Sequence, residues 1–331
     1  MKTVWLILSA LTVINFASSS LAAGYYPTPE EQCTSVDFRN TFPLKMRNQH
    51  DVSWCFAHAT SDYLQYTFQI NEQISAADVA INYSQSNLDK LMHFFQSMGG
   101  KEGRELPAQT GFQKVAVKKI LPQGYCPESA LPSDEWNRVD VTTGTQTKTE
   151  IKMAILETFD IQQDIKSGDI ANPSQLSNYY TFKNIDRDQF YSILKNSKSS
   201  KLMENIRVAA CKNDRRPFGQ KISLDYKFRG KNIFNSINAS FNAGMPVTID
   251  FFDDIFRHYD KPKIDINNLH TVLVYGRKFN QETQQCQYMI KDSYGEQCFR
   301  YDPKIECEKG YVWLPENKLF HTLASRLILH K

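Results

Sequence analysis

Residues 49–58 of the 331-residue chain read QHDVSWCFAH, and this stretch carries the strongest signal for fold and function. Gln49 stands six residues before Cys55, and the aromatic Phe56 follows the cysteine directly. Far downstream, His270 lies in the apolar run LHTVLVYG, and Asp292 begins the run DSYG. A cysteine, a histidine and an Asn/Asp-type residue in this order, after a glutamine, provide a nucleophile, its base, an orienting group and an oxyanion donor.

The order and flanks of these residues resemble the motifs of the papain-like cysteine peptidases, over residues 37–132 and 233–319. The resemblance implies an α+β, papain-like two-lobe fold, with a helical left lobe and a twisted β-barrel as the right lobe. It implies that Cys55 attacks a peptide carbonyl and that Gln49 stabilises the oxyanion. His270 would carry the proton, and Asp292 would orient His270. The implied partners are peptide or protein substrates, and no metal or organic cofactor is expected.

The sequence departs from the family pattern at several positions. Asp292 stands where the family has asparagine, but a carboxylate also accepts a hydrogen bond from an imidazole. Val52 occupies the position of a family cysteine, and Phe56 that of a tryptophan. His58 is interpreted as a packed side chain, because the family places an apolar residue there. Gly99–Gly100 resemble the glycine pair that binds substrate backbone, although a plain turn explains them equally well.

The first 22 residues have the features of a signal peptide: Lys2, a mostly apolar run and small residues before Ala22. That run is shorter than the roughly 20 residues needed to span a bilayer, although an uncleaved anchor is the alternative. We therefore expect a secreted or periplasmic protein, or a lysosome-like location in a eukaryote, without a membrane segment after cleavage. No other segment is long and apolar enough to cross a membrane.

The seven cysteines are an odd number, so at least one thiol stays unpaired in an oxidising compartment. We predict that Cys55 is the free thiol and that the other six form three disulfide bonds. Cys286, Cys298 and Cys307 lie close in sequence, so at least one pair should be local. The remaining bonds should include Cys126 or Cys211.

Hydrophobic periodicity predicts the main elements. We expect helices at residues 52–70, at 74–80 with Ser75 as the cap, and at 111–120. Cys55 would then lie at the N-terminal end of the first helix, where backbone N–H groups favour a thiolate. Two further helices are expected at 149–159 and 187–195. Strands are expected at 246–252, 271–275, 288–292 and 310–315.

Residues 132–231 do not fit the family pattern and are predicted to be an insertion between the lobes at 23–131 and 232–331. The cysteine–histidine separation is 270 − 55 = 215 residues, against about 130–150 in the papain-type spacing. We expect the insertion to carry its own helices. It could limit access to the active site as a wall or lid, or it could be a surface elaboration far from the site.

The composition and the motifs leave three functions to compare. The formal net charge is +3 without a basic stripe, so nucleic-acid binding is not supported. An exported cysteine endopeptidase fits the motifs best. A cysteine acyltransferase of transglutaminase type uses a similar Cys-His-Asp set, and a non-enzymatic binder on a papain-like fold is the third possibility. The sequence does not predict the oligomeric state.

Overall fold

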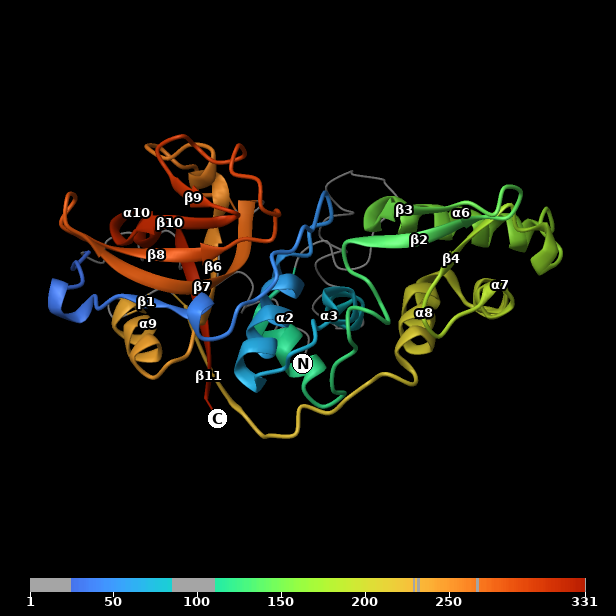
Figure 1. The fold of residues 1–331 in the computed structure, drawn as a ribbon, viewed down its shortest axis with the longest axis horizontal. Coiled ribbons are helices and arrows are strands. Elements are labelled where there is room, and N and C mark those ends of the chain that lie inside the picture. The colour runs from blue at the N-terminus through green and yellow to red at the C-terminus, as the bar shows by residue number, and fades with distance from the viewer. Residues whose placement is uncertain (1–24, 85–110, 229, 231–232, 266–267, 331) are drawn as a thin grey trace, which may run out of the picture. The chain divides into compact units, whose positions relative to one another are not determined.

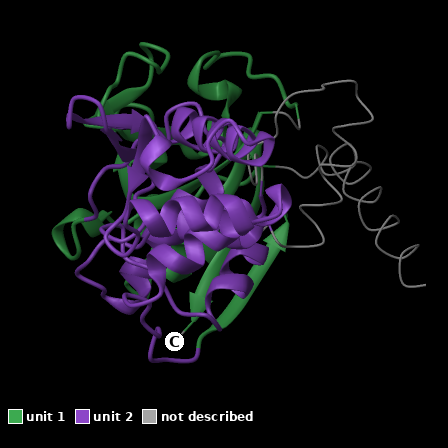
Figure 2. Cartoon of the chain, turned by 90° about the vertical axis from the view of Figure 1, so that its right-hand side faces the viewer, with its two compact units in different colours: residues 1–43, 222–292, 296–331 green, residues 44–221, 293–295 purple. Residues whose placement is uncertain are grey.

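The computed structural model describes residues 25–84, 111–228, 230, 233–265 and 268–330. The expected signal peptide and Gly99–Gly100 lie outside the described residues. The chain forms two compact units (Figure 2). Unit 1 comprises residues 1–43, 222–292 and 296–331, and unit 2 comprises residues 44–221 and 293–295. Within the described ranges, no helix combines the length and the apolar composition that a membrane crossing requires.

In the described part of unit 1, eight strands form one antiparallel sheet (Figure 1). The strand order is β5-β11-β6-β7-β8-β10-β9, and β1 pairs with β7 beside this path. The strands are β1 (Val36–Asp37), β5 (Ser223–Phe228), β6 (Val247–Phe252), β7 (Leu269–Asn280), β8 (Gln285–Lys291), β9 (Glu306–Glu308), β10 (Tyr311–Pro315) and β11 (Leu323–His330).

The sheet corrects the predicted right lobe, because it does not close into a barrel. Its path ends at β5 and at β9, and these two strands do not pair. Closure requires hydrogen bonds between the two edges. The edge strand β9 has only three residues, Glu306–Glu308, and two of them are glutamates. A short charged edge strand resists further pairing, so the sheet stays open.

Strand β7 is longer than the predicted strand, which ended before Gly276. It runs from Leu269 to Asn280 and changes register with β8 between Val274 and Gly276. A Cβ at Gly276 would lie 2.7 Å from the backbone oxygen of Val36 in β1. Glycine is therefore required at position 276, where β1 pairs with β7 beside the bulge. His270 lies near the start of this long strand.

Among the described residues of unit 1, the α-helices are α9 (Ile233–Asn242) and α10 (Glu316–Thr322). The short 3-10 helices there are η2 (Glu30–Gln32), η3 (Phe38–Asn40) and η6 (Asp253–Phe256). α9 contacts β6, and α10 contacts β6, β8 and β10. The lead segment is tied to the sheet by the Cys33–Cys286 disulfide and by Arg277, which donates to the backbone oxygen of Thr34 at 2.7 Å.

Three helices of unit 2 follow the sequence predictions: α2 (Cys55–Phe68), α3 (Ala76–Tyr83) and α5 (Gln113–Ile120). They contact one another. The Ser75 hydroxyl accepts a hydrogen bond from the Asp78 N–H at 3.0 Å, so the predicted cap is confirmed. α2 begins three residues later than predicted, because residues 49–54 form tight turns, with the Val52 N–H bonded to the Gln49 carbonyl.

The predicted insertion contains both expected helices and elements that the sequence did not reveal. The helices are α6 (Ile151–Ser167), α7 (Arg187–Asn196) and α8 (Leu202–Cys211), and the strands β2 (Glu135–Asp140), β3 (Gln146–Glu150) and β4 (Asn178–Thr181) form a sheet in the order β3-β2-β4. β3 reads QTKTE and is mostly exposed, so it lacks the apolar alternation that predicts a strand. Trp136 anchors this sheet through ring contacts with Tyr180 and Phe182.

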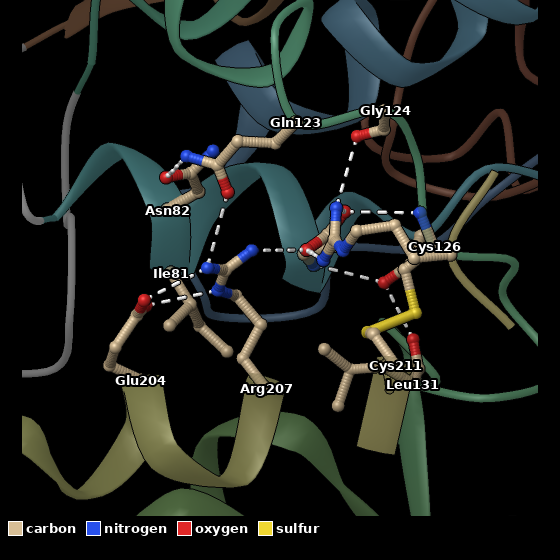
Figure 3. A network of polar contacts seen from close by, with 12 residues as sticks. Ile81, Asn82, Gln123, Gly124, Cys126, Leu131, Glu204, Arg207 and Cys211 are labelled. Carbon is tan, nitrogen blue, oxygen red and sulfur yellow. Dashed lines mark hydrogen bonds and ion pairs between the residues drawn. A yellow bond between two sulfur atoms is a disulfide. The ribbon is translucent and has the colours of Figure 1, made fainter. Parts of the chain in front are cut away.

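Within unit 2, a buried polar network holds α8 to α3, and a disulfide joins Cys211 at the end of α8 to Cys126, which follows α5. Asp78 on α3 is fully buried and accepts hydrogen bonds from Arg207 at 2.8 Å and from Arg215 at 2.5 Å. Figure 3 shows Arg207 reaching from α8 toward Glu204 and Gln123. The Cys126–Cys211 disulfide lies beside this network. Residues 202–215 are therefore held to the core helices of the unit.

The disulfides confirm the prediction from the cysteine count. Cys33 pairs with Cys286, Cys126 with Cys211, and Cys298 with Cys307. The last bond is the expected local pair, with a separation of nine residues. All seven cysteines are described residues, and Cys55 alone is free. Three such bonds fit an extracellular or lysosomal protein, because disulfides persist in oxidising compartments.

Candidate functional site

Cys55 is the first residue of α2, and its residue surface is 8% exposed. The preceding Trp54 provides no side-chain cap, and its backbone oxygen accepts from the N–H groups of Ala57 and His58. The N–H of Cys55 belongs to the first turn, whose donors have no acceptor within the helix. Cys55 thus provides both a sulfur atom and a backbone N–H donor at the start of α2.

The start of α2 is fixed by packing around Phe56, which is fully buried. Its ring contacts that of Tyr83 on α3, with centroids 4.8 Å apart. Gly111 approaches so closely that a Cβ there would lie 2.8 Å from three ring carbons of Phe56. The Tyr83 hydroxyl accepts in turn from the Phe112 N–H at 3.3 Å. Phe56, which directly follows Cys55, is therefore packed between α3 and the residues that precede α5.

Gln49 is 3% exposed and is held in unit 2 by Ser293 at two points. Its N–H donates to the Ser293 carbonyl at 2.7 Å, and its Oε1 accepts from the Ser293 hydroxyl at 2.6 Å. With the amide oxygen used in this way, the NH2 group is the end that can donate to a ligand. Ser293 is a site residue that we did not predict, although it directly follows Asp292 in sequence.

His270 and Asp292 form a buried pair in unit 1. The His270 Nε2 lies 2.8 Å from Asp292 Oδ1, and the two residues are 3% and 0% exposed. His270 is the second residue of β7, and Asp292 follows the last residue of β8, which pairs with β7. Because the carboxylate engages Nε2, proton exchange with another group would use Nδ1.

Three further side chains of unit 1 surround this pair. Phe251 and Phe256 contact the imidazole edge-on, with centroid distances of 5.9 and 6.4 Å. The Tyr301 hydroxyl donates to Asp292 Oδ2 at 3.0 Å, so both oxygens of the carboxylate are engaged. Tyr301 lies nine residues after Asp292, outside any predicted motif, and no signal in a single sequence identifies it.

Asp253, at the start of η6, adds an acidic group near the pair. Burial raises the pKa of the Asp253 carboxyl, and the charge of Asp292 raises it further, while His270 and Arg257 lower it. Asp253 also lies 3.8 Å from Arg257. The electrostatic environment of His270 therefore includes two carboxyl groups from its own unit.

The predicted site residues are divided between the two units. Cys55 and Gln49 belong to unit 2, and His270 and Asp292 belong to unit 1. His58 is 1% exposed within α2, as expected for a packed side chain. Gly99 and Gly100 lie outside the described residues. In the described part of the chain, no group of three or more His, Cys, Asp or Glu side chains is arranged to hold a metal ion.

No protein-family model and no curated protein sequence matches this chain. Among solved structures, the chain is similar to the bromelain protease from Ananas comosus in complex with the E64 inhibitor. That match has 12% identity and a TM-score of 0.44 and covers 90% of this chain and 98% of that chain.

Two further structures give comparable values. Digestive procathepsin L2 proteinase from Tenebrio molitor larval midgut matches at 13% identity with a TM-score of 0.47. That match covers 94% of this chain and 70% of that chain. The structure on the limited antibody cross reactivity between the mite allergens Blo t 1 and Der p 1 matches at 12% identity with a TM-score of 0.46. That match covers 94% of this chain and 76% of that chain. At these identities and TM-scores the likeness says nothing of the activity of this chain.

Proposed function

We propose that this protein is an exported cysteine endopeptidase that hydrolyses peptide bonds through Cys55, His270, Asp292 and Gln49. The observation that carries the proposal is the buried His270–Asp292 pair, in which a carboxylate 2.8 Å from Nε2 fixes the imidazole. The free thiol of Cys55 at the start of α2 supports it, because the other six cysteines are in disulfides. The disulfides also support a site of action outside the cytosol.

In the proposed reaction the Cys55 thiol passes its proton to His270, and the sulfur attacks the carbonyl carbon of the substrate. The negative charge that develops on the carbonyl oxygen is stabilised by the Gln49 NH2 group and the Cys55 N–H. His270 then donates a proton to the leaving amine, the C–N bond breaks, and a thioester remains on Cys55. Water loses a proton to His270 and attacks the thioester. The C–S bond then breaks, the carboxylic acid is released, and His270 returns the proton to the Cys55 sulfur.

The proposal is tested with Cys55→Ser and His270→Ala in the disulfide-bonded chain. We expect each variant to keep its fold and to lose peptide hydrolysis by about 10³-fold or more, because a nucleophile or its base is removed. Hydrolysis of a peptide library and circular dichroism provide the two measurements. His330→Ala is the control, because His330 is exposed at the end of β11. Near-full activity in a folded Cys55 or His270 variant would contradict the assignment.

Acyl transfer is the second candidate, and Asp292 is the observation that favours it. A carboxylate orienter also serves the Cys-His-Asp sets of transglutaminase-like enzymes. A peptidase passes the acyl group to water, whereas a transferase passes it to an amine. Mass spectrometry of the products, with a primary amine added to the assay, distinguishes the two: the acid should dominate for a peptidase and the amide for a transferase.

A further inference from the structure

The segment that carries Gln49 is held within unit 2 by an isolated β-bridge. Asn48 forms an antiparallel bridge with Tyr294, and the Gly295 N–H donates to the Arg47 carbonyl at 2.8 Å. Beside this bridge lie the backbone bond and the side-chain bond between Gln49 and Ser293. The backbone is therefore fixed on one side by residues 293–295.

Arg47 is buried, with 1% exposure, and its guanidinium meets carboxylates from two parts of unit 2. Its Nε donates to Asp62 Oδ1 at 2.8 Å, and its Nη1 lies 3.5 Å from Glu128 Oε2. Asp62 belongs to α2 and stands seven residues after Cys55, which is about two helical turns on the same face. Arg47 thus joins the segment that carries Gln49 to the helix that begins with Cys55.

The carboxylates around Arg47 would be costly to bury without it. Glu128 accepts from the Ser133 N–H at 2.5 Å and from its hydroxyl at 2.7 Å. Burial raises the pKa of Glu128 to about 7, and the positive charge of Arg47 opposes this rise. Arg47 likewise opposes the burial-driven rise in the pKa of Asp134. The single guanidinium therefore compensates several acidic groups, which fixes its position.

We propose that Arg47 is the positioning residue for Gln49, and that its ion pairs with Asp62 and Glu128 set the place of the Gln49 amide relative to the start of α2. The inference rests on the proposed peptidase function, in which Gln49 and the Cys55 N–H bind the oxyanion together. Two donors that act on one oxygen must keep a fixed separation, and small displacements of such groups lower the rate strongly.

The proposal predicts a specific kinetic signature. The oxyanion forms only in the transition state, so a displaced Gln49 lowers kcat and leaves KM nearly unchanged. Alkylation of Cys55 by iodoacetamide creates no oxyanion and should not depend on Gln49. A general disturbance of α2, in contrast, changes alkylation and kcat together.

The test uses Arg47→Lys in the full chain, because a single ammonium on an unbranched stem cannot form the same two contacts. We expect kcat to fall about 10-fold to 100-fold, with KM and the alkylation rate within about 2-fold. Arg47→Met combined with Asp62→Asn is the second variant, since it leaves no unpaired charge on α2. Arg326→Lys is the matched control: Arg326 is also 1% exposed and pairs with Asp225 at 2.8 Å in unit 1.

A double-variant comparison completes the test. In a Gln49→Ala background, Arg47→Lys should lower kcat by less than about 2-fold, because the group it positions is gone. An equal loss in both backgrounds, an unchanged kcat in Arg47→Lys, or a parallel loss of alkylation would overturn the positioning role while the peptidase assignment stands. An inactive wild-type chain would instead overturn the proposed function, and this inference with it.

Discussion

At the scale of single residues, the main departure from the papain-like motif is the carboxylate at position 292. Asp292 accepts from the His270 ring through one oxygen and from the Tyr301 hydroxyl through the other. The side chain is fully buried, so its orientation is set by these two partners. An asparagine can serve the same geometry, because its oxygen accepts from Nε2 and its NH2 group can donate to the Tyr301 oxygen.

We therefore predict that Asp292→Asn keeps peptide hydrolysis within about 10-fold of wild type, whereas Asp292→Ala loses about 10²-fold or more. The alanine removes the acceptor that orients His270, and the asparagine keeps it. Steady-state kinetics on one peptide substrate provide the measurement, and circular dichroism checks the fold. Equal losses in both variants would show that the carboxylate charge, rather than the geometry, is required.

At the scale of elements, the position of Cys55 depends on how α2 meets α3 and the chain before α5. Phe56 lies between the Tyr83 ring and Gly111, and there is no room for a methyl group at Gly111. Because Phe56 and Tyr83 are both fully buried, neither ring can move into solvent.

Gly111→Ala should accordingly lower the free energy of unfolding by about 1–3 kcal/mol, because it over-packs a closed core. Gly230→Ala is the matched control: a Cβ there meets nothing within 4 Å, so its effect should stay within about 0.5 kcal/mol. Urea denaturation of the two variants and the wild type provides the comparison. Similar stability of Gly111→Ala and Gly230→Ala would mean that the Phe56 contact is less tight than the distances indicate.

At the scale of the molecule, buried polar groups join the two ends of the chain within unit 1. Glu316, in the first turn of α10, is fully buried and accepts from the Thr28 N–H at 3.1 Å. The Tyr288 hydroxyl lies 3.4 Å from its other oxygen. Burial raises the pKa of Glu316 to about 7, and the hydrogen bonds from Thr28 and Tyr288 offset only part of this rise.

The raised pKa gives a stability prediction with a definite sign. The folded chain holds the Glu316 proton more tightly than the unfolded chain, so stability present below about pH 4.5 is lost as the pH rises toward about 7. Glu316→Gln removes this loss and should be more stable than wild type at pH 8, by an amount on the order of 3 kcal/mol.

Urea denaturation at pH 4.5, 6 and 8 measures this effect. Glu282→Gln, at an exposed position in the β7–β8 turn, is the control and should follow the wild-type curve. Burial raises the pKa of Glu128 to about 7 as well. The free energy of unfolding of all three proteins should therefore retain the part of its pH dependence that comes from Glu128. Parallel curves for wild type and Glu316→Gln would contradict the prediction.

The sequence alone determined the features that depend on local pattern. The helical period placed α2, α3 and α5 to within a few residues, because apolar spacing and caps act within one or two turns. The odd cysteine count, read with the motif, identified Cys55 as the free thiol. The order of Gln49, Cys55, His270 and Asp292 gave the candidate chemistry, because a catalytic set is recognised by residue types and their flanks.

Only the tertiary structure decided which distant groups meet. Ser293 and Gln49 are 244 residues apart and share two hydrogen bonds, and Tyr301 reaches Asp292 from a loop without a motif. The sequence likewise did not predict the open sheet, the polar strand β3 or the contacts of Arg47 with Asp62 and Glu128. A contact between distant residues depends on strand pairing, register and burial of the whole unit, and none of these leaves a periodic trace in one sequence.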